Sequence, residues 1–132
     1  MSFVHLAIGS ADVAATTDYL CRVMQWDRVS MPENIPLEVS WIDITPTRDR
    51  SQQIHVIHVD GFEVSPFERE FGRHLAVMHD GSDFPALKQR IEQYGGELID
   101  PIRTTPFERF FFREPINGYL FEVIDRQAWS IE

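Results

Sequence analysis

The chain carries one sequence pattern twice, and this duplication most constrains how it can fold. FVHLAI around His5 corresponds to GRHLAV around His74, 69 residues further on. QIHVIHV around His55 corresponds to LFEVIDR around Glu122, 67 residues further on. Matched segments at near-equal spacing indicate an internal repeat. We therefore predict that residues 1–132 form a single domain of two copies, residues 1–61 and 72–132, joined by an extended connector at residues 62–71.

Each copy reads as a strand, a helix and further strands. In the first copy we expect strands at residues 3–8, 37–44 and 54–59, a polar loop at residues 47–53, and a helix that begins after Asp12 and ends near Trp26. In the second copy we expect strands at residues 74–78, 97–102, 109–113 and 119–124. Its helix has Asp83 as N-cap, an apolar stripe from Phe84 to Tyr94 and a stop at Gly95. The prediction is an α+β fold of two tandem βαβββ modules.

Composition narrows the class of partner. The formal net charge is −9, so the surface repels phosphate backbones and nucleic acid is an unexpected partner. The same surface tolerates a cationic small molecule. Cys21 is the only cysteine, so an internal disulfide is excluded and a reducing compartment is favoured. No signal peptide opens the chain and no apolar run reaches the roughly 20 residues of a membrane span, so we expect a cytoplasmic protein without membrane contact.

The repeat brings metal-capable side chains to matched positions. His5 and His74 fall on equivalent first strands, and His55 and Glu122 on equivalent last strands. Glu122 is a lone charge in an apolar strand, which is costly unless a partner neutralises it. Imidazoles with one carboxylate suit Zn²⁺, Fe²⁺, Ni²⁺ or Mn²⁺ and leave positions open for substrate. We predict a metal site with His5, His74 and Glu122 as ligands.

The other histidines carry less information. His55 has three readings: a fourth metal ligand, a base beside the metal, or a histidine on the sheet face. A single strand histidine is commonly a hydrogen-bonded structural residue, and His58 and His79 are predicted to be surface groups of that kind.

The repeat and three motifs resemble the vicinal oxygen chelate superfamily. The motifs are HLAI from His5, HLAV from His74 and PINGYLFE ending at Glu122. The superfamily includes glyoxalase I, bleomycin-resistance proteins and extradiol dioxygenases, and the resemblance implies curved mixed sheets around a central cavity. Its metal ligands fall on the same three residues. The layout is similar to that of short glyoxalase I chains, but these have a glutamate, ligand and base, where this chain has His55.

The resemblance also implies an activity. Two vicinal oxygens of a small-molecule substrate would chelate the metal, as in a glyoxalase-like lyase or isomerase, with His55 and Glu122 as catalytic residues. The alternatives are an Fe²⁺ extradiol-type dioxygenase and a metal-free binding protein of the bleomycin-resistance type. Short members of the family form sites across a dimer, so a homodimer is expected. Residues expected to contact the substrate are two arginines for an anion and three cavity walls: Arg109, Arg113, Phe111, Trp41 and Met78.

Overall fold

The computed structural model describes residues 3–45 and 51–128, and the chain divides into two compact units, Met1–Glu63 and Val64–Glu132. The division falls inside the predicted connector. Most of the predicted polar loop at residues 47–53 lies outside the described residues. No helix in the described part of the chain is both long enough and apolar enough to cross a membrane.

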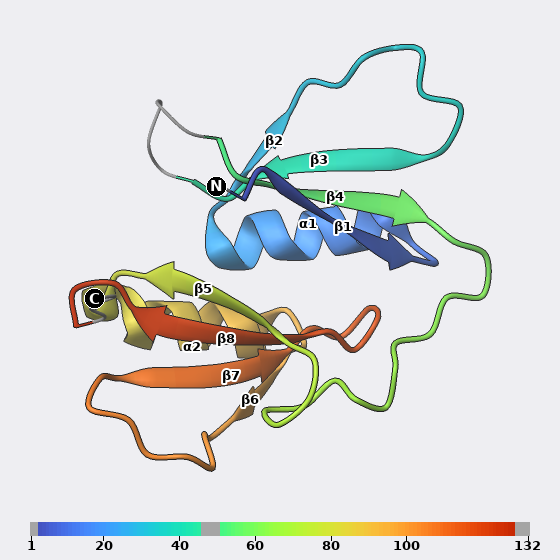
Figure 1. Cartoon of the computed structure of the whole chain (residues 1–132). Coiled ribbons are helices and arrows are strands. Elements are labelled where there is room, and N and C mark those ends of the chain that lie inside the picture. Colours follow the sequence, from blue (N-terminus) through green and yellow to red (C-terminus); the bar gives the residue numbers. More distant parts are fainter. Residues whose placement is uncertain (1–2, 46–50, 129–132) are drawn as a thin grey trace. The chain divides into compact units, whose positions relative to one another are not determined.

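The first unit is one helix on a four-stranded mixed sheet (Figure 1). Its elements are β1 (His5–Ser10), α1 (Val13–Met24), β2 (Asp27–Val29), β3 (Val39–Asp43) and β4 (Gln53–His58). The strand order is β1-β4-β3-β2, with β1 parallel to β4 and the other pairs antiparallel. The carboxylate of Asp12 caps α1 by accepting from the backbone N–H of Ala15, as the sequence predicts.

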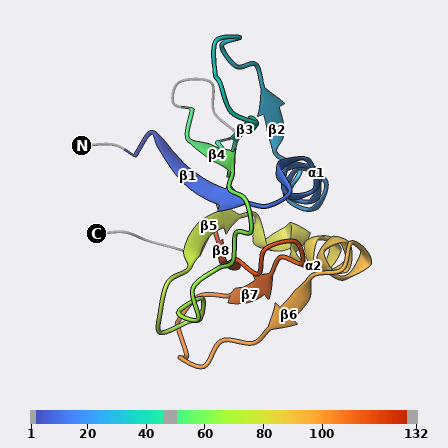
Figure 2. The same cartoon turned by 90° about the vertical axis from the view of Figure 1, so that its right-hand side faces the viewer.

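The second unit repeats this arrangement. Its elements are β5 (Leu75–His79), a 3₁₀ turn η1 (Gly81–Asp83), α2 (Phe84–Gln93), β6 (Glu97–Ile99), β7 (Arg109–Arg113) and β8 (Leu120–Asp125). The strand order is β5-β8-β7-β6. Figure 2 views α1 and α2 nearly end-on, each beside the sheet of its own unit. The α+β fold with two tandem βαβββ modules is confirmed.

The strand registers show how closely the copies agree. Ala7 lies opposite His55, and Ala76 lies opposite Glu122. On the other side of the central strand, Trp41 faces His55 and Phe111 faces Glu122. His55 and Glu122 therefore occupy equivalent positions, as their spacing predicts.

Burial alternates along β3 and β4 and separates the two faces of the first sheet, whereas β7 and β8 are buried at consecutive positions. Ile42, Ile54 and Val56 are fully buried on the face that α1 covers. Phe110 packs edge-on against Phe84 of α2, so the odd-numbered residues of β7 point to the opposite face. We call the face of each sheet that lies away from its helix the open face. It carries His55 and Trp41 in the first sheet and Glu122 and Phe111 in the second.

Several local predictions are wrong. β2 is missing from the sequence prediction because its three residues, two of them charged, are too short to show alternation. The strand predicted at residues 97–102 ends at Ile99, shortly before Pro101, which has no backbone donor. The connector is extended only at first; it then turns and forms a bridge between Glu68 and Arg73.

The end of β5 also differs from its prediction. Asp83 makes no capping hydrogen bond to the backbone. Its carboxylate instead lies 2.7 Å from His79 Nε2 and accepts from Arg90 Nη2 at 2.9 Å. His79 is not a surface group, because its side chain is 15% exposed and stacks on Phe84.

Candidate metal-binding site

Two of the predicted ligands meet in the second unit. His74 lies one residue before β5, and Glu122 lies in the middle of β8, which pairs with β5. His74 Nε2 is 3.3 Å from Glu122 Oε1. Two ligands of one ion, with bonds of about 2.1 Å, stand about 3.0–3.4 Å apart in octahedral or tetrahedral geometry. The pair therefore matches the spacing of two metal ligands.

The hydrogen-bond partners of His74 fit the same role. Its Nδ1 lies 3.3 Å from the backbone carbonyl of Arg69. A carbonyl only accepts, so Nδ1 is the donor in this contact. Nε2 faces the carboxylate of Glu122, a second acceptor, so a proton or a cation must lie between these two atoms. Histidine ligands commonly donate their other N–H to a backbone carbonyl in this way.

Arg109 provides the partner that a charge in an apolar strand needs. Its Nη1 donates to Glu122 Oε2 at 2.7 Å, and its Nη2 donates to Glu70 Oε2 at 3.2 Å and to the carbonyl of Arg103. The side chains of Arg109 and Glu122 are only 3% and 9% exposed. Arg109 therefore neutralises Glu122 through one oxygen and leaves the other oxygen toward His74.

Glu70 is held as a carboxylate by several donors. Burial would raise its pKa, but backbone N–H groups of Ile102 and Arg103 and the guanidinium of Arg109 outweigh burial and lower the pKa below its usual value. The backbone bonds are 2.7 and 2.9 Å long. Glu70 thus links Arg109 to the loop between β6 and β7.

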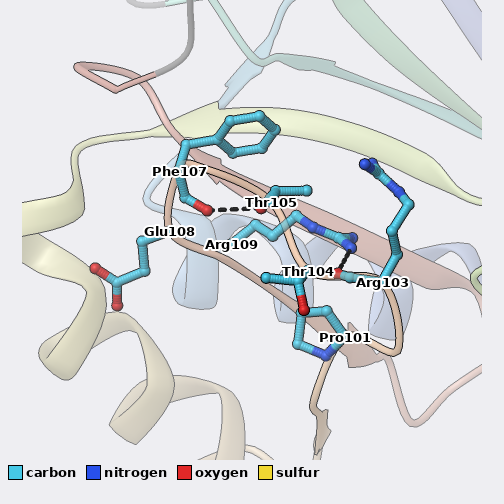
Figure 3. A pocket seen from close by; sticks show the side chains of 7 residues that line it. All are labelled: Pro101, Arg103, Thr104, Thr105, Phe107, Glu108 and Arg109. Atoms are coloured by element: carbon cyan, nitrogen blue, oxygen red, sulfur yellow. Dashed lines mark hydrogen bonds between the residues drawn. The ribbon is translucent and has the colours of Figure 1, made fainter.

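That loop contains a shallow pocket of about 230 Å³ (Figure 3). In this view Arg109 reaches across the loop to the Arg103 carbonyl, while the side chain of Glu108 points away from Arg109. Thr105 closes the loop by donating to the carbonyl of Phe107 at 2.7 Å. Arg109 is thus shared between the pocket wall and the Glu122 carboxylate.

The equivalent face of the first unit holds a stack of rings. The rings of His5 and His55 lie with their centroids 4.1 Å apart, and those of His55 and Trp41 lie 4.4 Å apart, all nearly parallel. Burial, and then the neighbouring His5, lower the pKa of His55. Among the described residues, no cluster of three His, Cys, Asp or Glu side chains stands ready to hold a metal ion.

Gln53 fixes the tautomer of His55. The amide nitrogen of Gln53 donates to Ser51 Oγ at 3.1 Å, which turns its oxygen toward His55 Nε2 at 2.8 Å. Nε2 therefore carries the hydrogen, and Nδ1 has the lone pair.

An apolar pocket of about 180 Å³ adjoins this stack. His55 and Trp41 line it together with four aliphatic residues. The aliphatic residues are Ile35, Leu37, Val39 and Ile57.

The remaining predicted residues are distributed over the open face of the second unit. Phe111 is 1% exposed and meets the ring of His74 edge-on at 5.3 Å. Met78 is 41% exposed. Arg113 donates to the carbonyls of Gly118 at 3.0 Å and Glu68 at 3.1 Å.

Sequence reasoning missed Glu70 and the carbonyl of Arg69. Both lie in the connector, where no periodic pattern marks them. The sequence marks Glu70 only as an acidic residue shortly before the HLAV motif. No pattern in the sequence indicates that it contacts Arg109, 39 positions further on.

The duplicated βαβββ fold, with histidine and carboxylate on its open faces, is that of the vicinal oxygen chelate proteins. A family model described as the Glyoxalase/Bleomycin resistance protein/Dioxygenase superfamily matches residues 2–123. The chain belongs to this superfamily. No curated protein sequence matches it significantly.

Solved structures are similar to this chain in fold. The fosfomycin resistance protein FosX from Listeria monocytogenes has a TM-score of 0.72 and 14% identity, covering 94% of this chain and 90% of that chain. A mutant of the Listeria protein, complexed with Mn(II) and 1S,2S-dihydroxypropylphosphonic acid, has a TM-score of 0.71 and 16% identity, covering 98% and 94%. A glyoxylase/bleomycin resistance protein/dioxygenase domain from Frankia sp. EAN1pec has a TM-score of 0.72 and 16% identity, covering 95% and 98%.

Proposed function

We propose that this chain is a divalent-metal-dependent enzyme of glyoxalase-like type, a lyase or isomerase of a small molecule with two vicinal oxygens. The observation that carries the proposal is the 3.3 Å approach of His74 Nε2 and Glu122 Oε1, with His74 Nδ1 directed at a carbonyl and Glu122 Oε2 bound by Arg109. The superfamily and the Mn(II) complex of a FosX mutant support it. The donors suit Zn²⁺, Fe²⁺, Ni²⁺ or Mn²⁺.

His74 and Glu122 would hold the ion together with His5, from the same chain or from a second copy. The bound ion would supply Lewis acidity to the substrate oxygens. We propose His55 as the base, since its Nε2–H is engaged by Gln53 and its Nδ1 has the lone pair. The same lone pair would suit a fourth ligand, and the coordination number of the bound ion distinguishes the two roles.

Substrate recognition is assigned to side chains on the two open faces. The apolar pocket beside Trp41 would take an uncharged group of the substrate, with Phe111 and Met78 as further walls. Arg113 would attract a substrate anion with the guanidinium donors that its two carbonyl partners leave unused. Arg109, whose side chain is 3% exposed and paired with two carboxylates, would act on the substrate through Glu122. The protein is proposed to be a cytoplasmic homodimer; a monomer by light scattering at micromolar concentration contradicts the dimer.

Metal binding by the purified protein tests the proposal. We expect elemental analysis to find a transition metal. Titration with Mn²⁺ should saturate at one ion per chain. His74→Ala and Glu122→Gln should each weaken the Mn²⁺ affinity by at least about 100-fold. Losing a residue that only hydrogen-bonds to a ligand costs about 10–100-fold in affinity, and losing the ligand itself should cost more. Glu92→Gln, an exposed glutamate of α2, is the control and should leave the affinity unchanged.

Reaction assays then separate the enzymatic readings. Turnover of a hemithioacetal or another hydroxycarbonyl compound by the metal-loaded protein supports the lyase or isomerase. Oxygen uptake with catechols in the presence of Fe²⁺ instead supports an extradiol-type dioxygenase.

A metal-free binding protein is the second candidate function. The net charge of −9 favours it, because it suits a cationic ligand. It predicts no bound transition metal, no gain of thermal stability on adding one, and affinity for a cationic ligand. If His5→Ala and Glu122→Ala leave metal affinity and activity unchanged from the wild type, these residues form no functional site and the metal-dependent proposal is wrong.

A further inference from the structure

Residues 68–70, in the second half of the connector, support the two candidate ligands of the second unit. They contact His74 directly, and they contact Arg109 and β8, which hold Glu122. The carbonyl of Arg69 accepts from His74 Nδ1. Glu70 accepts from Arg109, which binds Glu122. Glu68 Oε2 accepts from the backbone N–H of Leu120, the first residue of β8, at 2.8 Å. A segment without helix or strand therefore holds two strands in place.

Glu70 occupies the central position of this arrangement. Its side chain is 10% exposed, and its oxygens accept from the backbone N–H groups of Ile102 and Arg103 as well as from Arg109. These backbone donors fix the carboxylate independently of Arg109. The guanidinium is consequently pulled toward a fixed negative charge on the side away from Glu122.

The effect on Glu122 follows from the geometry of guanidinium. An arginine with a single carboxylate partner tends to take both carboxylate oxygens in a bidentate pair. Arg109 has two carboxylate partners, and its hydrogen bond to Glu122 is made to Oε2. Oε1 is left toward His74. Without Glu70, Arg109 would compete with a cation for the second oxygen of Glu122.

We propose that Glu70 is a positioning residue of the metal site: it divides the charge of Arg109 so that one oxygen of Glu122 remains available to the ion. This inference rests on the proposed function. It assigns a role in metal affinity to a residue that touches neither metal nor substrate.

Metal titration of a charge-neutral variant tests the inference. We expect Glu70→Gln to weaken Mn²⁺ binding, followed by electron paramagnetic resonance, by about 10–100-fold, the usual effect of losing a group that orients a ligand. Glu63→Gln, an exposed residue of the same connector, should leave the dissociation constant unchanged. Thermal unfolding in EDTA establishes that each variant is folded at the titration temperature. The absorption spectrum of bound Co²⁺ should also change in Glu70→Gln, which loss of stability alone does not produce.

The outcomes are distinct. If the wild type binds Mn²⁺ and Glu122→Gln abolishes binding, but Glu70→Gln binds as tightly as the wild type, the role of Glu70 is refuted and the proposed function stands. If neither Glu122→Gln nor His74→Ala weakens binding, the proposed function fails first. If Glu70→Gln does not fold, Glu70→Ala removes the same charge with a smaller side chain, and a wild-type dissociation constant for Mn²⁺ in that variant also refutes the inference.

Discussion

Replacing Arg109 with methionine tests whether the charged cluster around Glu122 is essential to the fold. The substitution keeps much of the apolar length of a side chain that is 3% exposed, but it removes the cation between Glu122 and Glu70. Breaking a buried ion pair by removing one partner costs about 3–5 kcal/mol, because the other charge stays buried without compensation. For 132 residues, this loss corresponds to a fall in Tm of about 10–18 °C.

Urea denaturation of the metal-free protein in EDTA measures this loss without assuming any metal site. Arg22→Met is the control: Arg22 forms an exposed ion pair with Asp18, and its loss should cost less than about 0.5 kcal/mol. The double variant Arg109→Met with Glu122→Gln should recover part of the loss, since the uncompensated charge is gone. A loss below about 1 kcal/mol in Arg109→Met would refute the reasoning, since it falls well short of the usual cost of an uncompensated buried charge.

Three further substitutions test features of the second unit. Glu114→Ala should lower the free energy of unfolding by about 3 kcal/mol, measured by urea denaturation. Glu114 is 1% exposed, and its carboxylate accepts from three backbone N–H groups of the following turn. A loss under about 1 kcal/mol contradicts this expectation. Hydrogen bonds from His79 and Arg90 lower the pKa of Asp83, so its stabilising effect is present above the ordinary value of 3.8 and is lost as the pH falls through the lower folded value. The difference in unfolding free energy between wild type and Asp83→Asn should therefore shrink across that acid range, and a constant difference argues against the assignment. Gly118→Ala should cost about 1–2 kcal/mol, because Gly118 has φ of 94°, and unchanged stability shows that the turn relaxes.

The sequence predicts the parts of this structure that depend on local periodicity. Alternating residues and helical stripes are encoded over a few neighbouring positions, so both helices and most strands can be predicted. The equivalence of His55 and Glu122 is also predictable, because a duplication keeps its spacing and the strand register preserves it.

The groups that support the candidate ligands cannot be predicted in this way. Glu70 meets Arg109 across 39 positions of the chain, in a contact that depends on how the connector turns back. The carbonyl of Arg69 has no side-chain signature, and the three residues of β2 are too few to show a period. These features depend on tertiary contacts, so they become visible only when the fold is known.

The two copies differ at the position of His55 and Glu122, and a second difference, between Val39 and Arg109, accompanies it. Strand register makes Val39 the equivalent of Arg109, because each lies two residues before the ring that faces His55 or Glu122. A carboxylate in an apolar sheet requires a nearby cation, whereas a neutral imidazole does not. The glutamate and the arginine therefore belong together in one copy, and the histidine and the valine in the other. With no charge to neutralise, the first copy uses Val39 to line an apolar pocket, while the second copy uses Arg109 to hold a carboxylate oriented toward His74.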